Sequence, residues 1–356
     1  MTAMPLPQSL LRAVLTQDFP ATADSLQGGR PLGLMPSIDL ALAVFPRGRA
    51  PVLANVLFSR EHPQGIVARI GPRAGAVQGL RFDVDRTNAK GDSEAWLPGA
   101  DWSAMPWKPL WGQGPLRFVA PYPASLLKLL VAVGLGLALD ESSLPDWPAA
   151  LEPMITVSDN DATDTCVALL HRCGWLPQRL NNRLADVGLP TLQVNATTPA
   201  GGWRNGDGSG VGHIHMTAWD TVRLLWLLDA AAPPPPWLPG ASTASASRLL
   251  KPATRAHLHG VLRRQQLDEV LSSGSLKAEP GWVPGLPDAP AFAHKTGTTT
   301  NYASDAGIVS TPQAHYIVAV LTSLGDRYAP TPKCASTWRL PALGAAVHGI
   351  ALELSA

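Results

Sequence analysis

Short apolar runs separated by Pro, Gly and Arg characterise the chain between residues 38 and 84. Runs of about four to eight residues bounded by turn residues are typical of β-strands. Further runs of this kind, either alternating or continuously apolar, occur near the C-terminus. Strands are therefore predicted at 38–45, 51–58, 65–70, 80–84, 291–296, 305–310 and 316–322.

The middle of the chain has the longer spacing of apolar positions that is typical of helices. Helices are predicted near 10–15, 126–139, 163–170, 176–187, 217–228, 252–267 and 343–354. Strands, then helices, then strands again predict an α/β protein of the α+β type. We expect one antiparallel sheet, built from residues near 38–84 and 290–323 and flanked by helices, with an inserted helical lobe.

The same pattern predicts the domain organisation. An N-terminal extension is expected over residues 1–35, followed by a single domain over 36–356. The sheet of that domain is expected in 36–122 and 250–356, and its helical lobe in 123–249. A run of four prolines within 230–239 predicts a stiff, linker-like loop.

Composition narrows the possible partners. With 356 residues, 46% of them hydrophobic, the chain can bury a sizeable core. Its 28 basic and 27 acidic residues give no reason to expect nucleic acid or an anionic membrane as a partner. We expect a monomer that acts on a small molecule or a peptide. The apolar run 126–139 is too short to span a bilayer and carries Lys128.

The N-terminus has no basic segment followed by an apolar core, so no signal peptide is predicted. The expected location is the cytoplasm for the chain as written, or the periplasm if a signal has been removed. Three cysteines are too few for a disulfide framework and are expected to be small buried hydrophobes. Three tryptophans in the loop-like segment 85–114 either line a substrate cleft or pin that loop onto the body; they are Trp102, Trp107 and Trp111.

A Ser-x-x-Lys motif opens the long apolar run. On a helix, Ser125 and Lys128 would share one face, with Ser125 near the N-terminus, where free backbone N–H groups favour negative charge. A serine nucleophile needs these two things: a nearby amine to accept its proton and N–H donors for the oxyanion. Taken alone, the motif could be a chance match. Lys128 could equally be a surface lysine whose aliphatic stem covers apolar neighbours.

Two later motifs support a catalytic interpretation of the Ser-x-x-Lys motif. Ser158-Asp159-Asn160 precedes a predicted helix, and Lys295-Thr296-Gly297-Thr298 ends a predicted strand. Each alone fits a helix cap or a Thr-rich turn. The order Ser-x-x-Lys, Ser-Asp-Asn, Lys-Thr-Gly resembles the penicillin-interacting serine enzymes, most of all the class A β-lactamases, and also the penicillin-binding proteins and D-alanyl-D-alanine peptidases. The resemblance extends over about residues 116–322 and includes segments 117–120, 262–266 and 305–309.

The resemblance implies a bacterial serine hydrolase with a β-lactamase/transpeptidase-like fold that needs neither metal nor another cofactor. It implies that Ser125 is the acylated nucleophile, that Lys128 accepts or relays its proton, and that Ser158 passes a proton to the leaving nitrogen. The histidine pairs 213/215 and 257/259 lack the further ligands of a zinc site, so no metal is expected.

Five further residues would bind the substrate. The resemblance implies that Asn160 holds the substrate amide and that Lys295 and Thr296 bind a carboxylate. Gly297 would let the strand lie close to the substrate. The backbone N–H of Thr298, with that of the nucleophile, would form the oxyanion hole.

One feature of the class A enzymes is missing. They activate the deacylating water with a glutamate after the Ser-Asp-Asn motif, but no glutamate lies between Glu152 and Glu269. The nearby candidates for this role are Asp186, Asp207, His213 and His215. The sequence therefore predicts an amide hydrolase acting through an acyl-serine on a β-lactam or a D-alanyl peptide. The alternatives are a receptor that is acylated without turnover and a relative without chemistry.

Overall fold

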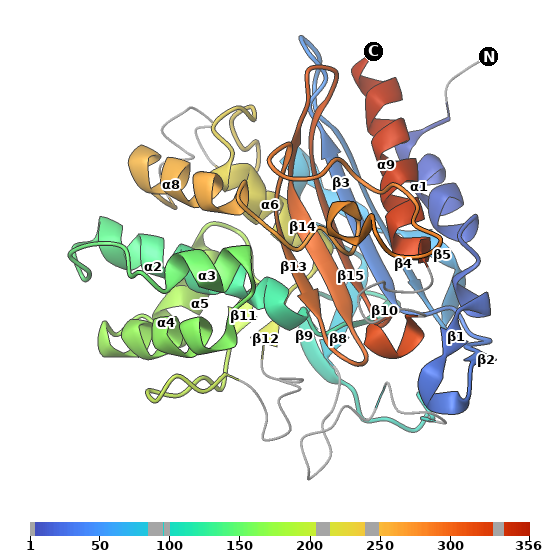
Figure 1. The fold of residues 1–356 in the computed structure, drawn as a ribbon, viewed down its shortest axis with the longest axis horizontal. Helices are drawn as coiled ribbons and strands as arrows, with labels where there is room; N and C mark the ends of the chain where they lie inside the picture. The colour runs from blue at the N-terminus through green and yellow to red at the C-terminus, as the bar shows by residue number, and fades with distance from the viewer. Residues whose placement is uncertain (1–3, 85–94, 96–99, 204–213, 239–248, 330–337) are drawn as a thin grey trace.

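A six-stranded antiparallel sheet forms the centre of the computed structural model, which describes residues 4–84, 95, 100–203, 214–238, 249–329 and 338–356 (Figure 1). Its order is β13-β14-β15-β3-β4-β5. The strands are β3 (Ile38–Val44), β4 (Val52–Ser59), β5 (His62–Val67), β13 (Phe292–Thr298), β14 (Ala303–Ser310) and β15 (His315–Thr322). β15 pairs with β3 along its length, so the predicted strands 38–45 and 316–322 do share one sheet.

The expectation that all of residues 38–84 would join this sheet was wrong. The chain leaves the sheet after Val67, and β6 (Arg69–Gly71) and β7 (Gly75–Gln78) form a separate hairpin. β8 (Leu80–Val84) pairs in parallel with β10 (Leu116–Ala120) and antiparallel with β9 (Lys108–Trp111). An apolar run identifies a strand but not its neighbour, which explains why the prediction placed β8 in the wrong sheet.

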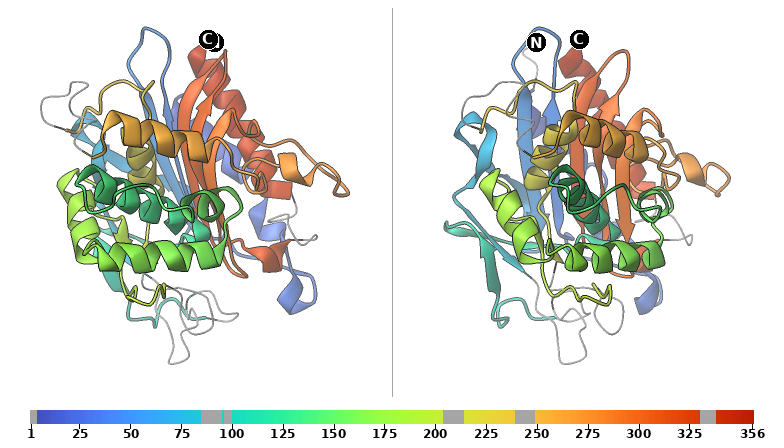
Figure 2. Two further views of the ribbon diagram at one scale, coloured as in Figure 1. Left: turned by 60° about the vertical axis from the view of Figure 1, so that its left-hand side comes forward. Right: turned by 90° about the vertical axis from the view of Figure 1, so that its left-hand side faces the viewer.

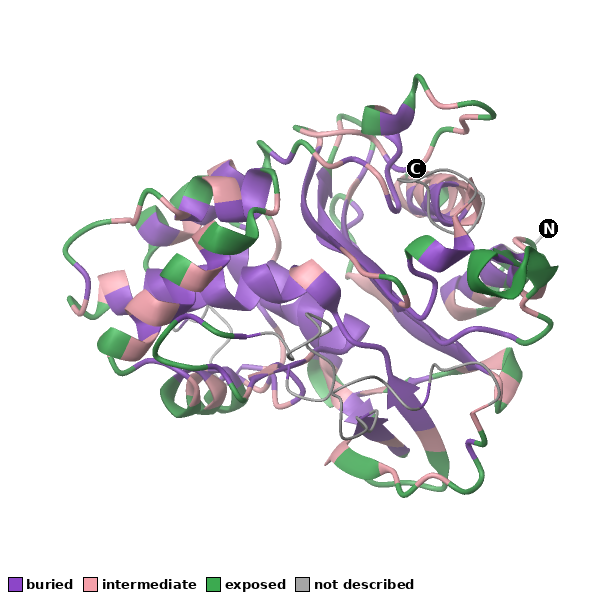
Figure 3. Ribbon diagram, turned by 60° about the horizontal axis from the view of Figure 1, so that its bottom comes forward, coloured by how far each residue is buried: buried purple, intermediate pink, exposed green. Residues whose placement is uncertain are grey.

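The main sheet is covered on both faces, and its strand residues alternate between two cores. Leu40 and Leu42 of β3 pack with α1 (Leu6–Leu15) and α9 (Arg339–Ser355), whereas Ala41 and Ala43 pack toward α6 (Ala218–Leu228). All seven residues of β3 are buried, as expected of a strand with both faces covered. Figure 3 shows the buried colour running through the sheet and into the helices beside it.

The helical lobe lies on the α6 side of the sheet (Figure 2). It consists of α2 (Lys128–Asp140), α3 (Leu151–Thr156), α4 (Asn160–Arg172), α5 (Gln178–Asp186) and α8 (Pro252–Leu262). α2 is buried from Lys128 to Ala138 and is therefore apolar on all sides. A Cβ at Gly134 would lie 3.0 Å from Leu170, so this glycine lets α4 approach α2 closely.

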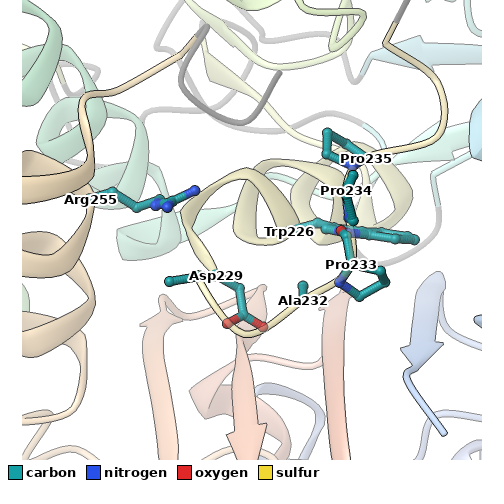
Figure 4. A pocket seen from close by; sticks show the side chains of 8 residues that line it. Trp226, Asp229, Ala232, Pro233, Pro234, Pro235 and Arg255 are labelled. Atoms are coloured by element: carbon teal, nitrogen blue, oxygen red, sulfur yellow. The ribbon is translucent and has the colours of Figure 1, made fainter. Parts of the chain in front are cut away.

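The proline run does not act as a linker. The Trp226 indole donates to the carbonyl of Pro233 at 2.6 Å, and the Trp237 indole donates to that of Val187 at 3.1 Å. Figure 4 shows Pro233, Pro234 and Pro235 beside Trp226 at a small pocket that Asp229 and Arg255 also line. The described part of this loop is thus held against α6 by Trp226 of that helix and against the end of α5 by its own Trp237.

The tryptophans of the segment before β10 pin their own loop. Trp102 donates to the carbonyl of Ala95, and Trp107 donates to the carbonyl of Trp102, with the two rings edge to face at 5.0 Å. Cys166 is buried, and burial raises the pKa of its thiol to about 12. Cys334 lies outside the described residues. No helix in the described parts of the chain has the length and apolar character needed to cross a membrane.

Candidate active site

The open edge of β13 faces the nucleophile turn. The backbone N–H of Thr299 donates to the carbonyl of Tyr302, and the backbone N–H of Ser310 donates to the carbonyl of Ala291. These two bonds show which residues of β13 form hydrogen-bonded pairs with β14. Alternate residues of an edge strand point their N–H groups away from the neighbouring strand. The N–H groups of Thr296 and Thr298 therefore point to the open edge of the sheet.

Ser125 lies in a 3-10 turn, η4 (Ala124–Leu127), that leads directly into α2. The prediction placed it near the N-terminus of an α-helix, whereas the structure has this tighter turn before the helix begins. Ala124, just before Ser125, has a left-handed backbone, with φ of 51°. Non-glycine residues rarely adopt this conformation, and such residues gather at functional sites. Ser125 is partly exposed, and its hydroxyl makes no hydrogen bond to any described residue. The structure thus leaves the proposed nucleophile open to solvent.

Gly297 and Ser304 hold this turn against the sheet. A Cβ at Gly297 would lie 2.6 Å from the backbone nitrogens of Ser125 and Leu126. The Ser304 hydroxyl, on the neighbouring strand, donates to the carbonyl of Pro123 at 2.5 Å. Only glycine allows so close an approach, which brings the backbone of Ser125 beside the end of β13.

Lys128 and Lys295 meet at Ser158. The Lys128 Nζ donates to the Ser158 hydroxyl at 3.1 Å, to the Ser158 carbonyl at 2.6 Å and to Asn160 Oδ1 at 2.7 Å. The Lys295 Nζ donates to the same hydroxyl at 3.0 Å and to the Thr296 carbonyl at 2.7 Å. Both lysines are fully buried, and Ser158 has a left-handed φ of 58°. Residues from α2, the α3–α4 turn and β13 therefore share one polar cluster.

Burial dominates the electrostatics of this cluster. Burial, followed by the nearby charge of Lys128, lowers the pKa of Lys295, and Glu269 and Asp305 act in the opposite direction; the net result is a pKa of about 7. An amine with a pKa near 7 exists in both forms at neutral pH, which is the property required of a group that relays protons.

A buried group behind β13 was missed by sequence reasoning. The Nδ1 of His294 lies 2.7 Å from Asp305 Oδ1, and its Nε2 lies 3.0 Å from Asp268 Oδ1. Burial alone would lower the pKa of His294, but the two carboxylates outweigh it and raise that pKa to about 9. The imidazolium thus joins β13, β14 and the loop after α8 directly behind Lys295.

Trp203 was also missed, because no motif marks it. Its ring centroid lies 5.7 Å from the Lys128 Nζ, and its indole donates to Asp164 Oδ1 at 2.6 Å. Trp203 follows Gly201 and Gly202 and is the last described residue before position 214. An aromatic residue beside Gly-rich sequence gives no sign of the lysine that it will contact.

No described hydrogen bond joins Asp186 or His215, two of the four candidates for a deacylating base, to this cluster. Asp207 and His213 lie outside the described residues. Asp186, at the end of α5, lines a separate pocket of about 450 Å³ with Glu141 and Arg179. His215 belongs to β12 (Ile214–His215), where it lies opposite Gln193. Within the described ranges, no group of three His, Cys, Asp or Glu side chains could hold a metal ion.

Comparison with known proteins gives a family and a fold. A model of the Beta-lactamase enzyme family matches residues 138–337, more than half of the chain, including Ser158, Asn160 and Lys295 but beginning after Ser125 and Lys128. No curated protein matched the sequence.

Several solved structures are similar over almost their whole length. A variant of PBP-A, solved as an acyl-enzyme complex with penicillin G, is 16% identical, with 98% of this chain and 97% of that chain covered and a TM-score of 0.51. A β-lactamase from Sphaerobacter thermophilus is 14% identical, with 97% of each chain covered and a TM-score of 0.50. A class A β-lactamase from Bacteroides cellulosilyticus is 13% identical, with 99% and 100% covered and a TM-score of 0.51. At these identities the likeness shows a β-lactamase/transpeptidase-like fold.

Proposed function

Since the chain belongs to the β-lactamase enzyme family, we propose that it is a serine hydrolase that forms a covalent acyl-enzyme on Ser125. The observation that carries the proposal is the shared hydrogen bonding of Lys128 and Lys295 to Ser158 beside the nucleophile turn. Two buried amines around one hydroxyl are expensive to desolvate, and a purely structural site would gain little from them.

In the proposed acylation step, the Ser125 Oγ attacks the carbonyl carbon of an amide and its proton passes to Lys128 in its neutral form. The backbone N–H groups of Ser125 and Thr298 stabilise the oxyanion. The C–N bond then breaks as Ser158 donates its proton to the leaving nitrogen. Ser158 recovers a proton from Lys295, which also hydrogen-bonds to it, while Lys128 keeps the proton taken from Ser125.

The proposed substrate carries a carboxylate near the scissile amide. Lys295 and Thr296 lie at the open edge of β13, and Asn160 lies beside Lys128, where its side chain can bind an amide. A β-lactam and a peptide ending in D-alanine both have this arrangement of amide and carboxylate. The substrate class that we propose is therefore a β-lactam or a D-alanyl peptide.

Intact-mass spectrometry after exposure to benzylpenicillin tests this proposal. We expect the wild type to gain the mass of one penicillin, and Ser125→Ala to gain none. Ser25→Ala, at an exposed serine in another part of the fold, is the matched control and should be acylated like the wild type. Absence of any adduct on the wild type would refute the proposed mechanism.

A receptor that stays acylated is the second candidate. It is favoured because the Trp203 ring lies 5.7 Å from the Lys128 Nζ and covers that lysine. A burst of one product per enzyme with a chromogenic cephalosporin, followed by no steady turnover, would support the receptor over the hydrolase.

A further inference from the structure

The ammonium group of Lys128 is enclosed. A lysine has three N–H donors, and the three acceptors already described, two on Ser158 and one on Asn160, lie 2.6–3.1 Å from it. The face of Trp203 lies 5.7 Å from the same nitrogen, and both side chains are buried. In this arrangement a water molecule has no room beside Lys128 on the side of Trp203.

The position of Trp203 is built by the chain around it. Thr198 and Gly202 close a tight turn through a backbone hydrogen bond of 2.8 Å. A Cβ at Gly201 would lie 2.4 Å from the carbonyl of Asp164, so the turn rests directly on α4. The Asp164 carboxylate then accepts the indole N–H at 2.6 Å. Asp164 follows Asn160 by four residues on α4, so the same helix face holds both the lysine and the ring.

We propose that Trp203, held by Asp164, sets the lifetime of the acyl-enzyme by keeping hydrolytic water away from Lys128. The inference rests on the proposed function of the site. Release requires the oxygen of water to attack the ester carbonyl carbon, one proton of the water to pass to a base, and the bond to Ser125 to break as its oxygen regains a proton. Trp203 occupies the space beside the base.

The ring also acts on the charge of Lys128. An aromatic face within about 6 Å of an ammonium group stabilises the charged form. After acylation Lys128 holds the proton of Ser125, and in that form it cannot accept a proton from water. Steric exclusion and charge stabilisation therefore both slow hydrolysis. The acylation step needs no water at this position, and it forms the same ammonium charge that the ring stabilises.

Trp203→Ala tests the inference. The space left behind is lined by polar groups of Lys128, Asn160 and Asp164, and a polar cavity of this kind fills with water. We expect the rate of acylation by benzylpenicillin to stay within about threefold of wild type, while the adduct decays about tenfold faster or more, because a positioned base typically contributes at least about 100-fold. Intact mass at successive times after removal of free penicillin measures the decay.

Trp147→Ala is the matched control, because Trp147 stacks on His257 and contacts α2 near Gly136. It loosens the helical lobe without opening the space beside Lys128, and should leave the adduct lifetime unchanged. Equal effects of the two variants, or a lifetime in Trp203→Ala that is unchanged or longer, would overturn the inference.

Variants of Asp164 provide an independent test if Trp203→Ala does not fold. Asp164→Asn keeps an acceptor for the indole and should preserve the lifetime, whereas Asp164→Ala frees the ring and should shorten it. Identical lifetimes in these two variants would contradict the inference. A wild type that forms no adduct would refute the proposed function itself. An adduct whose lifetime is unchanged by substitution of Trp203 or Asp164 would refute this inference alone.

Discussion

Lys128 and Lys295 approach one another through a single oxygen, the hydroxyl of Ser158, at 3.1 and 3.0 Å. They come from opposite sides of the site, Lys128 from the first turn of α2 and Lys295 from β13. Both are fully buried, so their charges are poorly screened by water. This arrangement makes the protonation of the pair sensitive to any change at either residue.

Lys295→Met should show the cost of burying this charge. The pKa of Lys295 falls from 10.5 in the unfolded chain to about 7 in the folded protein, so the unfolded state binds more protons between those pH values. The wild type therefore becomes more stable, relative to the variant, as pH rises through this window. Urea unfolding of both proteins at about pH 6, 8 and 10 measures the difference. A difference that does not change with pH would contradict the depressed pKa.

Gly297→Ala should separate the nucleophile turn from β13. The new methyl group would lie 2.6 Å from the nitrogens of Ser125 and Leu126, so the turn must move. We expect a loss of about 1–3 kcal/mol in the free energy of unfolding and acylation slower by about tenfold or more. Stopped-flow labelling with a fluorescent penicillin and urea unfolding measure the two effects.

Gly349→Ala is the control for that substitution. Gly349 lies in α9, and its added Cβ would meet no heavy atom within 4 Å. This variant should gain up to about 1 kcal/mol of stability from helix propensity and label at the wild-type rate. If Gly297→Ala labelled as fast as Gly349→Ala, the close approach of β13 to the turn would have no part in catalysis.

His294→Asn should destabilise the protein by about 3–5 kcal/mol near pH 6, because it leaves two buried carboxylates without their cation. The folded pKa of His294 is raised from 6.5 to about 9. Its contribution is therefore fully present below about pH 6.5 and is lost as pH rises through about 9. Thermal unfolding of wild type and variant across this range should show the gap narrowing with pH, and a gap that widens would contradict the assignment.

The sequence predicted the sheet and the motif residues because both depend on local patterns. The apolar runs at 38–45 and 316–322 are buried on both faces, and only a central position in a covered sheet satisfies them. The three motifs predicted which side chains carry the chemistry, and the structure brings Lys128, Ser158, Asn160 and Lys295 within hydrogen-bond distance of a neighbour.

Features that depend on tertiary contacts could not be predicted in this way. The parallel pairing of β8 with β10 joins two strands separated by a long segment of chain. The residues of neither strand indicate which strand it will pair with. Trp203 reaches Lys128 only because Gly201 rests on α4. The bonds of His294 to Asp268 and Asp305 require a loop and a neighbouring strand to meet behind β13. These contacts are set by folding and leave no local signal.

Locating the acyl group after penicillin treatment tests the central claim most directly. The adduct is trapped by acid, the protein is digested, and the peptides are sequenced by mass spectrometry. The proposed mechanism predicts one penicilloyl group, carried by Ser125 in the wild type and lost in Ser125→Ala, whose stability should change by about 1 kcal/mol or less. A penicilloyl group on another residue, or one that persists in Ser125→Ala, would contradict it.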